Sequence, residues 1–159
     1  MAVILFRRHE AWHVPFVVRR ADLPSHPGQI GLPGGMVRQW ESAWEAASRE
    51  AEEEIAVEAA RLVPLGAGPP LYAAVTNFSV VPLVAWLPNP DPSFRPDPRE
   101  LDSVLEVRLD RLLDEEAWLE EVEAFPGRHL PVEDTMIWGL TARLLADVLP
   151  RISAGAPVP

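Results

Sequence analysis

Three glutamates, Glu50, Glu53 and Glu54, carry the clearest chemical potential in the sequence, within "SREAEEEIAV". On an α-helix of about 3.6 residues per turn, their i, i+3 and i+4 spacing places them on one face, and Glu52 points elsewhere, toward solvent. Mg²⁺ prefers oxygen ligands and keeps several waters beside one or two carboxylates. This face could therefore hold one or more hard divalent cations.

Such a face has a cost, and a simpler interpretation exists. Like charges at helical spacing repel by a few tenths of a kcal/mol per pair, and carboxylates near a helix C-terminus oppose the macrodipole. The alternative is a solvated acidic face with intrahelical pairs such as Glu45 with Arg49, which is the commoner meaning of an isolated glutamate run. A cation site is favoured only if the surrounding sequence supports it.

The helix that must position the glutamates is predicted from Trp44 to Ile55. Trp44, Ala47, Ala51 and Ile55 form one apolar stripe, which would pack on a core. The segment before it, 21–35, has no helical period and several turn residues, so it predicts a shaped loop.

The rest of the chain alternates predicted strands and helices. "MAVILF" and "HVPFVVRR" predict a hairpin across the polar "RRHEAW". Further strands are predicted at 62–66, 71–76, 78–87 and 103–109, with Pro82 at an edge or a bulge. Amphipathic helices are predicted at 110–125 and 133–149. This mixture predicts one α/β domain over residues 1–150, with a mixed sheet between helices, and a flexible Pro-rich tail over 151–159.

Composition limits the partners. The 159 residues are 48% hydrophobic and carry a net charge of −10, which argues against a nucleic-acid or anionic membrane surface. A phosphate substrate stays open because a bound divalent cation reverses the local charge. The absence of cysteine excludes disulfides and thiolate metal sites. The opening apolar run is too short for a signal peptide or a membrane span, so we expect a cytoplasmic enzyme or binding domain.

The spacing around the glutamates resembles the Nudix box, G-x5-E-x7-R-E-U-x-E-E-x-G-U, where U is aliphatic. Gly35, Glu41, Arg49, Glu50, Glu53, Glu54 and Val57 occupy its positions. Two positions depart from it: the box glycine is Ala56, and the aliphatic slot after Arg-Glu is the small Ala51. The first departure would disturb the turn after the helix if that turn needs a positive φ, but it removes no ligand.

The resemblance implies roles for these residues. Glu50, Glu53 and Glu54 match the metal-binding glutamates, Arg49 and Glu41 the pair that braces loop and helix, and Gly34 and Gly35 the turn entering the box. In Nudix hydrolases, Mg²⁺ or Mn²⁺ holds a diphosphate, offsets its charge and activates the water that attacks phosphorus. The implied fold is an α/β/α sandwich with a mixed β-sheet.

The flanking segments resemble the coenzyme A pyrophosphatase branch of that family, with its L-L-T-x-R-S, H-x-G-Q and F-P-G-G signature and a C-terminal helix containing Ile-Trp-Gly-x-Thr-Ala. The matching residues are Arg20, His26, Gly28, Gln29, Pro33, Gly34 and Gly35, and "IWGLTA" in the segment 136–145. Val18, Ala21 and Leu32 depart from the signature. An arginine expected between Arg20 and His26 is also missing, and its loss would remove a bidentate phosphate contact.

The resemblance suggests further site residues. Arg20, His26, Gln29, Gly34 and Gly35 are candidates for substrate binding, although Arg20 could instead pair with a local acid and His26 could brace its loop. Glu100 matches an acidic position that leads into a late strand, where it would be a further metal ligand, the general base or simply a surface acid. Glu53 and Glu54 are alternative bases.

Three hypotheses follow. The first is a metal-dependent diphosphatase that cleaves coenzyme A or a derivative to 4′-phosphopantetheine and adenosine 3′,5′-bisphosphate. The second keeps the chemistry but acts on ADP-ribose, a dinucleoside polyphosphate or another nucleotide. The third is a Nudix-fold binding module without turnover, which the intact glutamates argue against. The expected partner is a small nucleotide, and a homodimer through the short N-terminal strands stays open.

Overall fold

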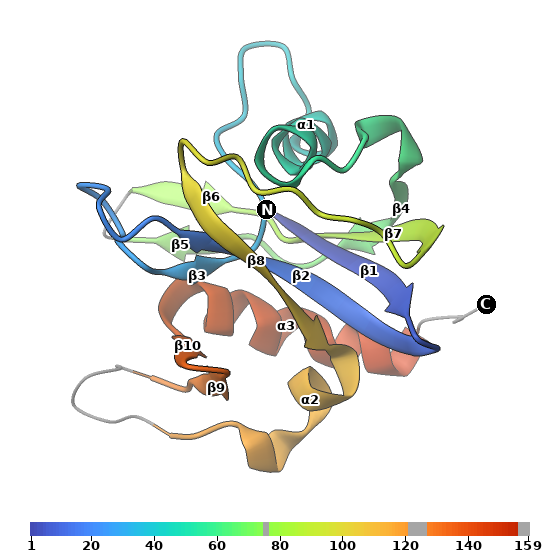
Figure 1. Ribbon diagram of the computed structural model, residues 1–159, viewed down its shortest axis with the longest axis vertical. Helices are drawn as coiled ribbons and strands as arrows, with labels where there is room; N and C mark the ends of the chain where they lie inside the picture. The colour runs from blue at the N-terminus through green and yellow to red at the C-terminus, as the bar shows by residue number, and fades with distance from the viewer. Residues whose placement is uncertain (75–76, 121–126, 156–159) are drawn as a thin grey trace.

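A mixed six-stranded sheet forms the centre of the protein, in a computed structural model that describes residues 1–74, 77–120 and 127–155. The strand order is β3-β2-β1-β7-β4, and β8 pairs with β2 (Figure 1). β1 runs parallel to β7, and the other pairs are antiparallel. The bounds are β1 Ala2–Arg8, β2 Ala11–Arg19, β3 Ile30–Gly31, β4 Val63–Ala67, β7 Leu83–Pro90 and β8 Leu101–Arg108.

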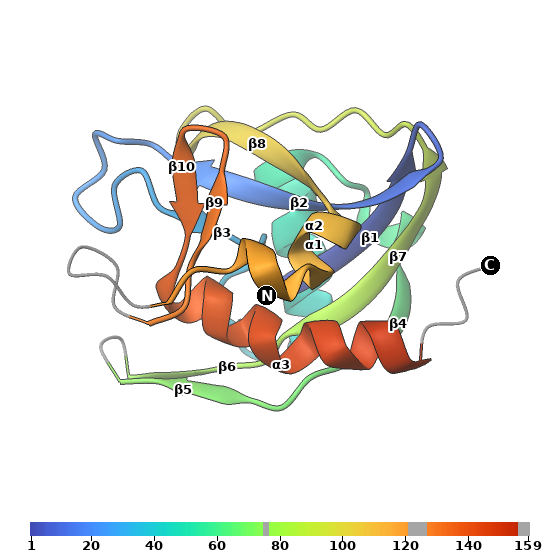
Figure 2. The ribbon, with the colours of Figure 1, turned by 90° about the horizontal axis from the view of Figure 1, so that it is seen from below.

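Helices cover both faces of this sheet. α1 (Ala43–Ile55) lies on one face, and α3 (Gly139–Gly155) lies on the other with the short α2 (Leu109–Leu113), as the two ribbon views show (Figures 1 and 2). The predicted α/β/α sandwich is therefore confirmed. The smaller elements are the hairpins β5 (Leu71–Ala73) with β6 (Phe78–Val80) and β9 (Leu130–Val132) with β10 (Thr135–Ile137), and single 3₁₀ turns at Ala59–Arg61 and Glu115–Ala117.

Alternation along β1 builds two hydrophobic cores, because successive side chains of a strand point to opposite faces. Ile4 and Phe6 pack in the core beneath α1, together with Ala51 of that helix. Val3 and Leu5 pack in the core on the α3 side. The apolar stripe predicted for the helix is confirmed: Ala47, Ala51 and Ile55 are buried, and the half-buried Trp44 packs against them.

The predicted N-terminal hairpin is confirmed. Phe6 faces His13 across it, and its turn residues, His9 and Glu10, have φ values of 46° and 66°, as the tight turns of twisted hairpins require. β1 is paired with β2 on one edge and β7 on the other.

The helix predicted over 110–125 is wrong in the part that the structure describes. α2 ends at Leu113, and the side chain of Asp114 accepts a hydrogen bond from the Glu116 backbone N–H at 3.1 Å, which supports a separate 3₁₀ turn. The buried Trp118 then donates its indole N–H to the Leu112 carbonyl at 2.9 Å. Core packing of Trp118 thus prevails over the helical pattern; residues 121–126 lie outside the described residues.

Two other predicted elements start or end differently. The helix predicted from residue 133 begins only at Gly139, whose φ of 61° is left-handed, and Thr135–Ile137 pairs with β9 instead. The strand predicted over 78–87 is interrupted at Val81 and Pro82, since proline has no N–H for a sheet ladder. α3 continues through Gly155, so the first residues of the predicted tail are helical, and 156–159 lie outside the described residues.

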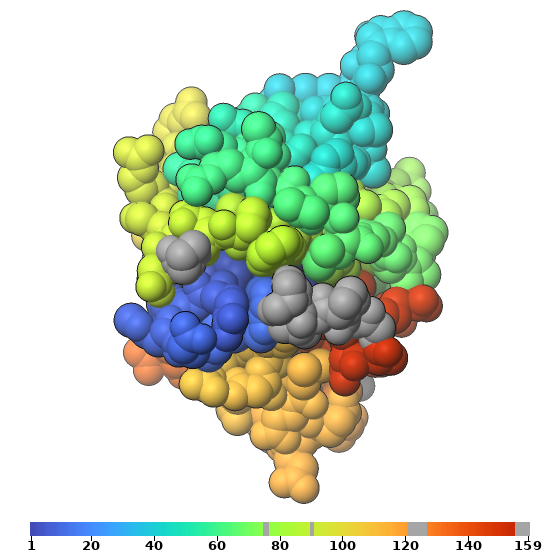
Figure 3. Space-filling model, turned by 90° about the vertical axis from the view of Figure 1, so that its right-hand side faces the viewer, coloured from blue at the N-terminus to red at the C-terminus, as the bar shows by residue number. Residues whose placement is uncertain are grey.

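The loop between β3 and α1 projects from the surface of the protein, as the space-filling view shows in light blue (Figure 3). Met36, Val37 and Trp40 of this loop are exposed, and Trp40 is the most exposed of them at 94%. Among the helices of the described residues, none combines the length and the apolar character that crossing a membrane requires.

Candidate active site

The second half of α1 presents Glu50, Glu53 and Glu54 in three different environments. The helix begins with a capping box, in which Ser42 and Glu45 each accept the other's backbone N–H. The side chain of Glu50 is 17% exposed and that of Glu53 is 45% exposed. Glu54 is half-buried.

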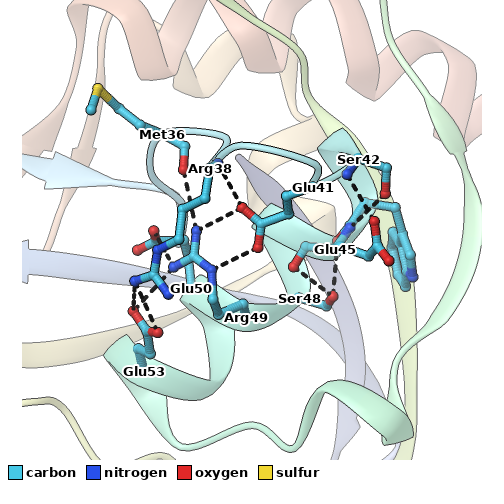
Figure 4. A network of polar contacts seen from close by, with 10 residues as sticks. Met36, Arg38, Glu41, Ser42, Glu45, Ser48, Arg49, Glu50 and Glu53 are labelled. Carbon is cyan, nitrogen blue, oxygen red and sulfur yellow. Dashed lines mark hydrogen bonds and ion pairs between the residues drawn. The ribbon is translucent and has the colours of Figure 1, made fainter.

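Arg49 joins this face to the preceding loop. Its Nε and Nη2 donate to the two carboxylate oxygens of Glu41 at 2.7 and 3.1 Å, and Nη2 also donates to the Met36 carbonyl at 3.2 Å (Figure 4). Glu45 is occupied by the capping box, so the pairing of Glu45 with Arg49 offered by spacing alone is wrong. The structure instead pairs Arg49 with Glu41, as the family resemblance implied.

Two arginines, Arg38 and Arg49, pair with Glu50 and Glu53. Arg49 Nη1 donates to Glu50 at 2.6 Å and to Glu53 at 3.1 Å. Arg38, from the projecting loop, donates through Nη2 to both oxygens of Glu53 at 3.2 and 3.3 Å. Hydrogen bonding to Glu41 and to Glu50 raises the pKa of Arg49, although partial burial opposes that change. The like-charge repulsion expected on this helix is therefore offset by cations of the chain itself.

Glu54 points inward, to the turn that enters the helix. Its Oε2 accepts the Gly34 backbone N–H at 2.9 Å. Burial raises the pKa of this carboxyl to about 7, and the charges of Glu50 and Glu100 act in the same direction. The Gly34 hydrogen bond and the positive charge of Arg19 oppose the rise.

The two glycines before the helix leave room that a side chain would fill. A Cβ on Gly35 would lie 2.5 Å from the carboxyl carbon of Glu50. A Cβ on Gly34, whose φ is 152°, would lie 2.6 Å from Cα of Met1. Both glycines thus permit a close approach of the backbone to a neighbouring group, and for Gly35 that group is the candidate ligand Glu50.

Glu100 faces the same region from another segment. It lies just before β8, and its carboxylate pairs with Arg19 at the end of β2, with Nη1 and Oε2 3.7 Å apart. The charge of Glu100 contributes to the raised pKa of Glu54, after burial and Glu50, whereas its role as a ligand or base stays a prediction. Sequence reasoning missed Arg19 and Arg38; alternation along β2 would have placed Arg19 on the α1 side with Val17, whereas Arg38 has no comparable signal.

The other predicted binding residues do not meet the glutamates. Arg20 pairs with Asp22, through Nε at 2.8 Å and Nη2 at 2.6 Å, which is the pairing with a local acid named above as its alternative role. His26 is exposed with a φ of 55°, and its carbonyl accepts the Gln29 N–H at 3.2 Å. Gln29 in turn accepts the Arg19 backbone N–H at 3.0 Å. Within the described residues, His26 and Gln29 shape the loop through their backbones.

The donor chemistry of α1 fits a hard divalent cation, because Glu50, Glu53 and Glu54 offer only carboxylate oxygens. Across residues 1–74, 77–120 and 127–155, however, no three histidine, aspartate or glutamate side chains already stand close enough together to share an ion. Their carboxylates are instead held by Arg38, by Arg49 and by the Gly34 N–H. Ion binding on this face thus requires Glu53 to leave its arginine partners.

Comparison with known proteins agrees with this geometry. The family model of the NUDIX domain matches residues 1–130. A protein of Pectobacterium atrosepticum named uncharacterized Nudix hydrolase NudL is 32% identical over 141 residues, covering 85% of this chain and 72% of its own. The protein of the same name from Escherichia coli is 30% identical over 151 residues, covering 84% and 72%.

Solved structures share the fold. An Ap4A hydrolase of C. elegans in a binary complex superposes with a TM-score of 0.54 at 24% identity, covering 69% of this chain and 80% of that one. The NUDIX domain of NrtR from Shewanella oneidensis, complexed with ADP ribose, gives 0.59 at 18% identity, covering 95% and 84%. On the family model and the curated relatives, together with the box geometry on α1, the chain belongs to the Nudix hydrolase family.

Proposed function

We propose that this protein hydrolyses a diphosphate linkage in a nucleoside diphosphate derivative, with Mg²⁺ or Mn²⁺ bound at α1. The observation that supports it most is the braced acidic face: Glu50, Glu53 and Glu54 on one side of the helix, fixed to the entering loop by Arg49 and Glu41. Carboxylate oxygens beside a glycine turn suit a charged phosphate substrate held through cations, once Glu53 has left its arginine partners.

Glu50, Glu53 and Glu54 would hold the ion, and once bound it would offset the diphosphate charge and activate the attacking water. The chain's own residues prepare this step. The Gly34 N–H fixes the orientation of Glu54, and Arg49 fixes Glu50. Glu53, Glu54 and Glu100 are the candidates for the general base, since all three border the same face.

The preferred substrate in this proposal is coenzyme A or a derivative. Its support is the match of the segment 17–35 to the coenzyme A pyrophosphatase signature. Cleavage would give 4′-phosphopantetheine and adenosine 3′,5′-bisphosphate. ADP-ribose and dinucleoside polyphosphates form the second candidate class, because neighbours of the same fold include an Ap4A hydrolase and a domain complexed with ADP ribose.

The first experiment is incubation of the purified protein with coenzyme A and Mg²⁺ or Mn²⁺, followed by chromatography of the products. Glu53→Gln should lower turnover by about 100-fold or more, since it removes a charged oxygen donor. Glu52→Gln is the matched control: Glu52 is exposed and accepts only the Ala59 N–H among the described residues, at 3.2 Å. That control should keep full turnover.

The outcomes separate the hypotheses. Adenosine 3′,5′-bisphosphate from the wild type and the control, but not from Glu53→Gln, supports both the substrate and the metal face. Intact coenzyme A with cleavage of ADP-ribose or a dinucleoside polyphosphate moves the assignment to the second class. Tight nucleotide binding without hydrolysis of any of these substrates, in either metal, would contradict the proposed catalysis.

A further inference from the structure

Two consecutive arginines at the end of β2, Arg19 and Arg20, have very different partners. Arg20 has an acceptor at each of its three nitrogens: Nε and Nη2 donate to Asp22 at 2.8 and 2.6 Å, and Nη1 donates to the Pro98 carbonyl at 2.6 Å. Three of the five N–H donors of this guanidinium are thus used within the protein, and its charge is paired with Asp22. A substrate contact by Arg20 would first have to break its pairing with Asp22.

Arg19 has fewer hydrogen-bond acceptors within the described residues than Arg20 has. The shortest ion-pair distance found for it, from Nη1 to Oε2 of Glu100, is 3.7 Å, which is too long for a hydrogen bond. Its Nε is buried and has no hydrogen-bond partner among the residues that the structure describes. Buried N–H groups are normally paired, so this guanidinium keeps donor capacity that the protein alone does not satisfy.

The position of Arg19 brings its unsatisfied donors to the side of the sheet that α1 covers, where Glu50, Glu53 and Glu54 lie. Val17, two residues earlier on β2, packs in the core beneath α1, and alternation along the strand turns Arg19 to the same side. The charge of Arg19 lowers the pKa of Glu54, whereas Glu50 and Glu100 raise it. Arg19 is therefore a cation within electrostatic range of Glu54, as is the Met1 ammonium, while Arg38 and Arg49 are held by Glu41, Glu50 and Glu53.

We propose that Arg19, rather than Arg20, is the arginine that binds the diphosphate of the substrate. This assignment rests on the proposed diphosphate hydrolysis. A guanidinium presents a planar fork that suits phosphate oxygens, and it pairs with them through charge-assisted hydrogen bonds. At the end of β2, on the α1 side of the sheet, Arg19 would contact the diphosphate beside the α1 glutamates, with Glu100 3.7 Å from its Nη1.

Binding and turnover of Arg19→Gln test the assignment. The probe for binding is α,β-methylene-ADP with Mg²⁺, measured by isothermal titration calorimetry, because its bridging carbon prevents hydrolysis. Loss of a charged hydrogen bond should weaken this binding by about 10- to 100-fold. Arg20→Gln should weaken it far less, and Arg61→Gln, an exposed change on the 3₁₀ turn after α1, should leave it unchanged.

A second comparison separates direct binding from positioning of Glu100. If Arg19 acts only by holding Glu100, then Arg19→Gln adds nothing in a Glu100→Gln background. Direct binding predicts that Arg19→Gln still weakens α,β-methylene-ADP in that background. Arg19→Lys should recover part of the affinity, since it keeps the charge but loses the fork. Thermal melting of each variant verifies that it is folded.

The possible results are distinct. The role of Arg19 is overturned, and the proposed function stays intact, if the wild type binds and cleaves diphosphates and Arg19→Gln binds the analogue equally well. The same conclusion follows if Arg20→Gln loses more affinity than Arg19→Gln. A wild type that neither binds the analogue nor cleaves any diphosphate overturns the proposed function and this assignment with it. A selective loss in Arg19→Gln that persists without Glu100 supports it.

Discussion

Arg49 holds Glu41 through two parallel hydrogen bonds, 2.7 Å from Nε to Oε1 and 3.1 Å from Nη2 to Oε2. Both side chains are largely buried, at 18% and 13% exposed. Glu41 lies before the helix and Arg49 within it, so one bidentate pair fixes the loop to the acidic face. Arg49 also reaches Glu50 and Glu53 through Nη1, which makes this pair the centre of the site.

We expect Arg49→Lys to lower kcat by about 10- to 100-fold, because lysine cannot make the bidentate pair and small displacements of reacting groups are costly. The measurement is kcat and KM for whichever diphosphate the wild type cleaves. Arg61→Lys, on the exposed 3₁₀ turn, is the matched control and should behave as the wild type. Equal kcat in Arg49→Lys and the wild type would show that the brace is dispensable.

Stability should fall in acid through the same pair. Hydrogen bonding to Arg49, and then to the Arg38 backbone N–H, lowers the pKa of Glu41 from 4.5 to about 2. A carboxyl whose pKa is lowered on folding stabilises the protein fully above its unfolded value, and this contribution is lost as the pH falls from about 4.5 toward 2. Urea unfolding at pH 6, 4.5 and 3 measures the loss.

Glu41→Gln provides the comparison for that titration. It should be less stable than the wild type at pH 6, and the difference should shrink as the pH approaches 3, because Glu41 of the unfolded wild type becomes protonated there whereas the folded carboxylate, with its pKa of about 2, stays charged. Asp97 has a pKa lowered to about 2 by Arg99 and titrates in the same window. Asp97→Asn must therefore be measured in parallel, and a pH-independent effect of Glu41→Gln would contradict the assignment.

Much of the acidic site was predictable because it is local. Glu50, Glu53 and Glu54 share a face by helical geometry alone. The partner of Arg49 was not predictable in this way, since spacing offered Glu45, and only the family resemblance implied Glu41. The capping box with Ser42 occupies the Glu45 side chain and so leaves Arg49 to Glu41. The S-x-x-E pattern of this capping box can be read in the sequence.

Elements that depend on tertiary contacts escaped prediction. The acidic run after α2 has a helical pattern, but the buried indole of Trp118 donates to Leu112 and turns the chain. The segment before α3 also looked helical, yet β10 pairs with β9 there. The hydroxyl of Thr141 then donates to the Ile30 carbonyl at 3.1 Å, which fixes α3 to a strand more than a hundred residues earlier. Such contacts outweigh local propensity.

The end of α1 should be improvable. Ala56, at the box position where glycine is expected, has a φ of 59° and is the C-terminal cap of the helix. A left-handed conformation costs a residue with a Cβ about 1 kcal/mol, whereas glycine adopts it freely. Ala56→Gly should therefore raise the free energy of unfolding by about 0.5–1 kcal/mol in urea titrations. The control Ala60→Gly, at an exposed position of the next turn, should lower it instead.

Gly35 is the position where the smallest change should do the most harm to the site. A Cβ there would lie 2.5 Å from the carboxyl carbon of Glu50, so Gly35→Ala must push that carboxylate away from Arg49. We expect kcat to fall by about 100-fold, with a weaker response to Mg²⁺, because Glu50 is a proposed ligand. Gly31→Ala is the matched control, since its Cβ would make only an ordinary 3.8 Å contact with Val17. Normal metal-dependent turnover in Gly35→Ala would mean that Glu50 can leave its place without loss, and would remove it from the proposed ligands.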